Sequence, residues 1–305
     1  MPGDRRPWTV FVAAALLAVT GCTAGASRGA ATPSAGASGS ESTATATSAR
    51  GDVPTPDHVV IVVYENKDAE QVVGSPDAPY LTSLSTSGAD FTDAHAETHP
   101  SQPNYLALFS GSTQGVTDDS CPLDLHGDNL ASQLLAAGKT FVGYSEDLPH
   151  AGATDCGAGE YRRKHNPWVN FADLPTGINQ PYTALPDDYA DLPTVSFLVP
   201  DLCNDMHDCD VATGDTWAKQ NLAPYVEWVT SHNSLLVVTF DESEGKGDDP
   251  IATLLVGPMV QAGDTAQHVD HYSILRTIEE MYGLEPLGEA ANRDPITDIW
   301  TSSAH

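Results

Sequence analysis

The run Val59-Val60-Ile61-Val62-Val63 decides the fold class of this 305-residue chain. Five consecutive β-branched residues are typical of a strand buried on both faces, as in a parallel sheet. Further apolar stretches predict strands at 140–144, 194–199, 234–240 and 251–256. Helical patterns occur among them at 129–137, 217–231 and 271–282. Strands that alternate with helices predict an α/β fold with a mainly parallel sheet.

The first 22 residues resemble a bacterial export signal. Arg5 and Arg6 form a charged start, and the apolar core at 10–19 is shorter than the roughly 20 residues that span a membrane. The run Val19-Thr20-Gly21-Cys22 resembles a lipobox, which implies cleavage before Cys22 and lipid on its sulfur. The alternative is an ordinary secretory signal. We expect an exported protein, either a lipoprotein on the outer face of the cytoplasmic membrane or secreted.

Residues 23–56 are rich in Ala, Ser, Thr and Gly and have few large apolar side chains. Such a segment cannot bury enough surface to offset its ordering entropy, so it predicts a disordered tether. The folded domain is expected at 57–305.

Four cysteines lie within this domain, and an even number in an exported chain indicates two disulfides. Three pairings are possible. We favour Cys203 with Cys209, which closes a short loop, and Cys121 with Cys156. No Cys-x-x-Cys spacing occurs, which makes a zinc site built from these cysteines the weaker interpretation.

The chain is strongly acidic, with 42 Asp and Glu against 13 Lys and Arg and a formal charge of −29. This balance argues against binding to nucleic acid, which relies on Lys and Arg. It also repels anions at long range. A site for an anionic group would therefore need a local cation, and the scarcity of Lys and Arg favours a divalent metal. Nothing in the sequence indicates an obligate protein partner, and the expected membrane contact is through the N-terminal lipid alone.

Polar residues follow three of the predicted strands, and the carboxyl ends of parallel strands form the ligand-binding edge of such sheets. Glu65-Asn66 follows the first strand, Asp241-Glu242 follows 234–240, and Asp201 with Asn204-Asp205-Met206-His207-Asp208 follows 194–199. Converging carboxylates would raise each other's pKa unless a cation joined them. Oxygen ligands suit Mg, Ca or Mn, and imidazole extends the choice to Zn or Fe. The alternative is that these residues only begin loops.

A serine lies between two prolines in the run His99-Pro100-Ser101-Gln102-Pro103-Asn104-Tyr105. The prolines restrict the backbone on both sides of it. The apolar residues that follow predict a helix with Pro103 in its first turn, and a helix N-terminus favours anions. Ser101 is thus a candidate nucleophile, and the alternative is a rigid turn with a capping serine.

The histidines divide into candidate site residues and surface residues. His268 and His271 lie at the start of the last predicted helix and would bind metal or donate a proton, unless they are surface residues beside its N-terminus. His99 lies two residues before Ser101 and would orient a phosphate. His95 is a weaker candidate. Apart from His207 in the strand-end segment above, the remaining histidines are treated as surface residues, including His150, His165 and His232.

Five motifs occur together and in a fixed order: Glu-Asn after a strand, Pro-Ser-x-Pro-Asn-Tyr, Pro-Asp-x-x-x-Asp-x-His-Asp, Asp-Glu after a strand, and His-Tyr-Ser-Ile-Leu-Arg-Thr-Ile-Glu. In this the chain resembles the phosphoesterase family of bacterial acid phosphatases and phospholipases C, a branch of the alkaline-phosphatase-like superfamily. The resemblance covers nearly all of 57–290. It implies a three-layer sandwich, with the sheet between helices, and a phosphoesterase catalytic domain at 57–305.

The resemblance also assigns roles to single residues. It implies that Ser101 is the nucleophile, which forms a transient phosphoserine, and that Asn104 donates a hydrogen bond to a phosphate oxygen. The metal ligands it implies are Glu65, Asn66, Ser101, Asp241 and Glu242. Many relatives carry Asp-His at the last pair, so one metal is expected rather than two.

The middle and late motifs give less definite roles. His207 or His271 would protonate the leaving oxygen. Additional phosphate-binding residues would be His99, Asp205, Asp208 and His268, with Asp201 as an alternative to Asp205.

The function that this implies is metal-dependent hydrolysis of small phosphate monoesters. The alternatives are a phospholipase C or other phosphodiesterase and, in another class, a lipoprotein that binds metal or phosphate without turnover.

Overall fold

The computed structural model describes residues 53–245 and 247–301. The predicted export signal, Cys22 and the tether up to residue 52 lie outside the described residues. At the other end of the tether, Thr55 Oγ1 donates a hydrogen bond to Met281 O, and the Tyr282 hydroxyl donates one to Pro56 O. The last residues of the predicted tether therefore pack against the folded domain.

The strands are β1 His58–Tyr64, β2 Ala89–Phe91, β3 Phe141–Ser145, β4 Gly157–Ala158, β5 Tyr161–Arg162, β6 Asn179–Pro181, β7 Val195–Val199, β8 Ser234–Phe240, β9 Leu254–Val256 and β10 Gly263–Thr265. The α-helices are α1 Ala69–Val72, α2 Pro79–Ser87, α3 Ser101–Ser110, α4 Leu130–Ala136, α5 Val211–Val229 and α6 His271–Tyr282. Short 3₁₀ helices are η1 Arg163–His165, η2 Pro167–Asn170, η3 Thr176–Ile178, η4 Tyr182–Ala184, η5 Tyr189–Asp191 and η6 Gly288–Asn292.

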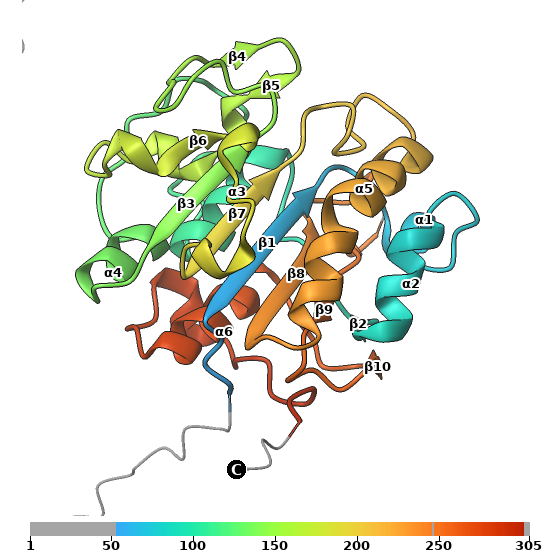
Figure 1. Cartoon of the computed structure of the whole chain (residues 1–305). Coiled ribbons are helices and arrows are strands. Elements are labelled where there is room, and N and C mark those ends of the chain that lie inside the picture. Colours follow the sequence, from blue (N-terminus) through green and yellow to red (C-terminus); the bar gives the residue numbers. More distant parts are fainter. Residues whose placement is uncertain (1–52, 246, 302–305) are drawn as a thin grey trace, which may run out of the picture. The chain divides into compact units, whose positions relative to one another are not determined.

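Eight strands form one sheet in the order β10-β2-β9-β8-β1-β7-β3-β6 (Figure 1). Their pairings give every strand the same direction except β9, which is antiparallel to β8 and to β2. The chain returns from β8 to β9 through a loop rather than a crossover helix, and such a return makes an antiparallel neighbour. The prediction of a mainly parallel sheet is confirmed.

The centre of the sheet is the apolar run from which the fold was predicted. Every residue of Val59–Tyr64 is at most 2% exposed, because β7 and β8 flank β1 on both edges and helices cover both faces. Helices α2 and α5 pack together on one face, and α3 and α6 on the other (Figure 1). All ten residues of α3 are buried, which fixes the helix that begins with Ser101.

Helix α5 begins at Val211, earlier than the predicted start at 217, because the Asp210 side chain accepts a hydrogen bond from Thr213 N and caps it. In the part of the chain that the structure describes, no helix has the length and apolar character needed to cross a membrane.

Both predicted disulfides are present. Cys203–Cys209 closes the loop that follows β7, and Cys121–Cys156 joins the segment after α3 to the β4–β5 hairpin. The second bridge ties down the region that leads into η1.

Candidate active site

Three adjacent strands deliver the site to one edge of the sheet. β7, β1 and β8 run side by side in parallel, so the residues that follow their carboxyl ends come together. The Ser101 hydroxyl lies 3.0 Å from Glu65 Oε2 and 3.2 Å from Glu242 Oε1. The structure thus brings together a serine from the start of α3 and carboxylates that follow β1 and β8. We call Glu65, Ser101, Lys164, Asp241 and Glu242 the Ser101 cluster.

Glu65 is the most completely bonded carboxylate of the cluster. Its Oε1 accepts a hydrogen bond from the Tyr105 hydroxyl at 2.6 Å and lies 3.0 Å from His165 Nε2. Its Oε2 accepts one from Asn66 Nδ2 at 2.9 Å in addition to that from Ser101. Burial opposes ionisation, but His165 and Lys164 outweigh it and lower the pKa of Glu65 to about 2. Glu65 is therefore a carboxylate throughout the physiological pH range.

At Asp241, burial and the neighbouring charges both favour the protonated form. Its Oδ1 accepts hydrogen bonds from the backbone N–H groups of Asn66 and Glu242, at 3.0 and 2.7 Å. Its Oδ2 is buried and has no hydrogen bond to a described residue. Burial, together with the neighbouring Glu65 and Glu242, raises the pKa of Asp241 well above its usual value. An orphaned carboxylate oxygen beside two further carboxylates needs a proton or a cation, and this donor set of oxygens fits a divalent metal.

The prediction that His165 is a surface residue is wrong. It is 1% exposed, and its ring lies between two buried carboxylates, with Nε2 on Glu65 and Nδ1 3.4 Å from Asp205 Oδ2. Burial opposes its charge, but Glu65 and Asp205 raise the pKa of His165 to about 9. Burial raises the pKa of Asp205 to about 6 against the opposing effect of His165. These three residues also have the spacing of a possible metal site.

Lys164 is a site residue that the sequence did not reveal. Its Nζ lies 3.3 Å from Ser101 Oγ and 2.9 Å from Asp119 Oδ2, and its side chain is only 14% exposed. Burial alone would lower its pKa, but Glu65 and Asp119 raise the pKa of Lys164 above its usual value. The local cation predicted to be a metal is therefore supplied at least in part by a lysine.

His99 supports the cluster from its solvent side. Its Nδ1 lies 2.5 Å from Glu242 Oε2 and its Nε2 lies 3.2 Å from Asp249 Oδ2. Burial raises the pKa of Glu242, and His99 partly opposes this shift. His99 is thus in contact with a residue of the Ser101 cluster, as its place in the sequence suggested.

The predicted role of Asn104 in binding phosphate is not favoured by its contacts. The side chain is fully buried, its Oδ1 accepts from the backbone of Glu97 and Thr98, and its Nδ2 donates to Thr98 O at 2.6 Å. A side chain committed in this way holds the loop that precedes Ser101.

Both ring nitrogens of His271 have partners within the protein. It is 1% exposed; its Nδ1 is paired with the Glu97 carboxylate and its Nε2 lies 2.8 Å from Phe240 O. A carbonyl oxygen only accepts, so Nε2 carries a proton that is already used. His271 thus holds the backbone just before Asp241, and its role in protonating the leaving oxygen stays a prediction.

In the loop after β7, Asp201 and Asp205 make different contacts. Asp201 accepts hydrogen bonds from the backbone N–H groups of Cys203 and Asn204 and so shapes the turn. Asp205 is the member that contacts His165. The His207 ring is tilted by 44° to the His165 ring, with centroids 6.4 Å apart, and its Nδ1 lies 2.6 Å from Asp208 Oδ1. His207 is partly exposed and lies beside the buried pair of His165 and Asp205.

His268 lies apart from these residues and pairs with Asp93, 3.2 Å from Nδ1 to Oδ2. None of the contacts that the structure gives to the described His268 involves the Ser101 cluster. Its predicted phosphate contact is not supported by this position.

The Phosphoesterase family matches residues 75–285. The chain is 49% identical over 251 residues to a phosphatidylinositol-3-phosphatase of Mycobacterium tuberculosis, which covers 81% of this chain and 84% of that protein. It is 30% identical over 253 residues to a probable acid phosphatase of Kluyveromyces lactis, covering 75% of this chain and 58% of that protein. These relatives confirm the resemblance drawn from the five motifs.

Solved structures confirm the fold at much lower identity. A protein of the alkaline phosphatase superfamily from Vibrio parahaemolyticus matches with a TM-score of 0.54 and 13% identity, covering 79% of this chain and 71% of that chain. The lipoteichoic acid synthase LtaP of Listeria monocytogenes matches with a TM-score of 0.55 and 11% identity, covering 77% and 74%. The chain therefore has the alkaline-phosphatase-like fold and belongs to the Phosphoesterase family, as a hydrolase of phosphoric ester bonds.

Proposed function

We propose that the chain hydrolyses phosphate monoesters by nucleophilic attack of Ser101 on phosphorus. The observation that carries this proposal is a buried serine hydroxyl held between two carboxylates, with the Lys164 ammonium 3.3 Å from its oxygen. Carboxylates accept the proton of such a hydroxyl, and a cation stabilises the charge that gathers at phosphorus. The names of the relatives, an acid phosphatase and a phosphatidylinositol-3-phosphatase, support a monoester as the substrate.

The residues that would hold a divalent metal are those of the sequence prediction: Glu65, Asn66, Ser101, Asp241 and Glu242. The orphaned Oδ2 of Asp241 supports this assignment. A metal bound there would polarise the Ser101 hydroxyl and offset negative charge on the phosphoryl group. The candidate metals are Mg, Ca, Mn, Zn and Fe, and we propose that one ion binds at Ser101.

The two carboxylates near Ser101 have different roles. Glu65, with a pKa of about 2, stays ionised and orients the hydroxyl. Glu242 Oε1 lies 3.2 Å from Oγ, and we assign it as the acceptor of the serine proton. The bond from Oγ to phosphorus forms as the ester oxygen departs, and His207 gives that oxygen a proton. Water then attacks the phosphoserine, releases phosphate and restores the serine hydroxyl.

We also propose that the protein works outside the cytoplasm. Two disulfides support an oxidising compartment. Export, lipid attachment at Cys22 and a tether at 23–56 remain predictions from the sequence. An exported phosphatase that is tethered to a membrane, or secreted, would meet small phosphate esters or the phosphorylated headgroups of lipids.

Comparison of Ser101→Ala with Ser110→Ala tests this proposal. Both serines lie in α3 and are buried, but Ser110 donates its hydrogen bond to Leu106 O within the helix. We expect Ser101→Ala to lose at least about 10³-fold in kcat on para-nitrophenyl phosphate, and Ser110→Ala to keep most activity. Hydrolysis should be faster on this monoester than on bis-para-nitrophenyl phosphate and should fall on chelation. Retained activity in Ser101→Ala would rule out Ser101 as the nucleophile. Faster hydrolysis of the diester would favour a phosphodiesterase, and absence of turnover in the unmodified protein would favour a binding protein.

A further inference from the structure

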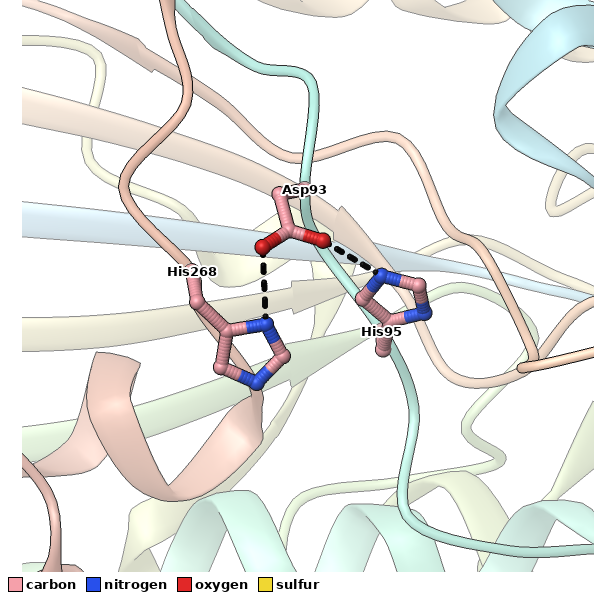
Figure 2. Close-up of side chains that lie close together, drawn as sticks. All are labelled: Asp93, His95 and His268. Carbon is pink, nitrogen blue, oxygen red and sulfur yellow. Dashed lines mark hydrogen bonds and ion pairs between the residues drawn. The ribbon is translucent and has the colours of Figure 1, made fainter.

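A second cluster of metal-ligating side chains lies away from Ser101, at the outer part of the sheet. Strands β2 and β10 are parallel neighbours, so their carboxyl ends meet, and Asp93, His95 and His268 follow them. Figure 2 shows the Asp93 carboxylate between the two imidazole rings. Its Oδ1 lies 2.9 Å from His95 Nε2 and its Oδ2 lies 3.2 Å from His268 Nδ1.

The hydrogen bond on the far side of His95 fixes how that ring is used. His95 Nδ1 lies 2.7 Å from the backbone oxygen of Asp248. A carbonyl oxygen only accepts, so Nδ1 carries a proton, and in the neutral ring Nε2 presents a lone pair toward Asp93. A lone pair facing a carboxylate oxygen is unfavourable unless a proton or a metal ion lies between them. Metal-binding histidines have this arrangement, with the second ring nitrogen donating to a backbone carbonyl.

The three donors have the spacing and openness of a metal site. One atom from each of Asp93, His95 and His268 lies within 4.8 Å of the others. The two imidazole rings are stacked, with centroids 5.5 Å apart. They line a cavity of about 780 Å³ whose lining also includes Asp248 and the ion pair of Asp270 with Arg293. The volume of this cavity leaves room for further ligands from solvent or a small molecule.

We propose that Asp93, His95 and His268 bind a divalent transition metal of the zinc type, separately from any ion at Ser101. Two imidazole nitrogens and one carboxylate oxygen are a common donor set for zinc, whereas Mg and Ca prefer oxygen alone. Three protein ligands leave at least one coordination position open toward the cavity. This inference does not depend on the proposed function.

His126 provides a matched control within the same chain. Its ring also lies near two carboxylates, 3.1 Å from Asp173 and 3.8 Å from Asp124, and is more exposed than that of His95. These three residues do not have the close spacing of the Asp93 group. Loss of His126 should therefore leave zinc binding unchanged.

The test is equilibrium dialysis of the metal-stripped full chain against Zn²⁺, followed by metal analysis. We expect the unmodified protein and His126→Ala to bind one more zinc ion than His95→Ala and His268→Ala, with affinity in the latter two lowered at least about 100-fold. Co²⁺ used as a spectroscopic probe should give visible bands that both variants lose. Because His268 is exposed, its variant keeps the test valid if His95→Ala misfolds. Equal zinc binding in the unmodified protein and His268→Ala would overturn the proposal, whatever the phosphatase activity.

Discussion

Replacement of Lys164 by methionine removes the only ammonium that the described structure places within hydrogen-bond distance of Ser101. Methionine keeps most of the length of the side chain and removes its charge. In the native protein Nζ lies 3.3 Å from Ser101 Oγ and is held in place by Asp119. Glu65 and Asp119 raise the pKa of Lys164, so the group is charged at any pH at which the enzyme would be assayed.

The expected size of the effect follows from this distance. A phosphoryl group bonded to Ser101 would bring negative charge to within about 4 Å of Nζ, where two unit charges interact by about 4 kcal/mol at an effective dielectric constant of 20. Part of this attraction is already present when the substrate binds. Loss of one such donor elsewhere costs about 10²- to 10³-fold in kcat, and we expect a loss of that order in kcat/KM for Lys164→Met.

The assay is steady-state hydrolysis of para-nitrophenyl phosphate, with Lys164→Arg and Lys139→Met measured beside it. Lys164→Arg keeps the charge and should recover part of the loss. Lys139 lies over the Tyr282 ring, away from the carboxylates, so Lys139→Met controls for the loss of one positive charge from an acidic protein. Activity of Lys164→Met within about threefold of the unmodified protein, with its fold intact by circular dichroism, would refute the role assigned to this lysine.

Other outcomes are expected at sites that can be varied separately. Burial raises the pKa of Glu279 to about 7, whereas an unfolded glutamate titrates near 4.3, so stability should fall as pH rises between these values. Glu279→Gln should then be more stable by up to about 3 kcal/mol at pH 8 and unchanged near pH 4 in denaturant unfolding; equal gains at both pH values would contradict this. His271→Asn should slow the hydrolysis of para-nitrophenyl phosphate and of phenyl phosphate equally, because His271 positions Asp241. His207→Asn should slow phenyl phosphate more, because phenolate is the poorer leaving group and needs the proton more. The reverse pattern would identify His271 as the acid. Replacing the Cys121–Cys156 pair by serines should cost about 4 kcal/mol against about 2 for the shorter Cys203–Cys209 loop, and unfolding free energies in the opposite order would rule out the loop-entropy account.

The fold could be predicted where the apolar pattern of a segment matches its position in the sheet. The apolar runs of β1 and β8 indicate strands buried on both faces, and parallel strands deliver their carboxyl ends to one edge whatever their order. Glu65 and Asp241 could therefore be placed together without knowledge of the register. The place of Ser101 could also be predicted from local pattern, because the prolines around it mark the start of a helix.

Lys164 and His165 could not be predicted, because tertiary contacts place them. They lie in η1, within a region of short strands and 3₁₀ turns that has no clear periodicity. Their neighbour Arg163 anchors this turn: its Nε donates to Asn170 Oδ1 at 2.9 Å, and its guanidinium also donates to three backbone carbonyl groups. In the sequence Arg163-Lys164-His165 is a basic run, which usually indicates a solvated surface. Only the folded chain shows that the arginine fixes the turn while the next two residues face carboxylates.

His271 and Asn104 show a second limit of sequence patterns. Both occur in motifs of the family and both lie close to the site, but their polar atoms are used within the protein. A motif identifies residues that the site needs without separating those that touch a substrate from those that hold the backbone. The hydrogen-bond partners make that distinction here: of the two imidazoles predicted to protonate the leaving oxygen, His271 has both nitrogens bonded within the protein, whereas His207 is bonded through Nδ1 to Asp208.

The charges at the site connect the composition to the mechanism. The scarcity of Lys and Arg predicted a metal as the local cation, yet the fold brings Lys164 and a protonated His165 to the buried carboxylates. These two cations, with His99 beside Glu242, face the four carboxylates of Glu65, Asp205, Asp241 and Glu242, so the negative side chains outnumber the positive ones. The imbalance is concentrated at Asp241, whose Oδ2 has no hydrogen bond to a described residue and whose pKa is raised. We infer that lysine and metal have different tasks: Lys164 acts on the phosphoryl group at Ser101, and a divalent ion is needed to keep Asp241 ionised beside Glu65 and Glu242.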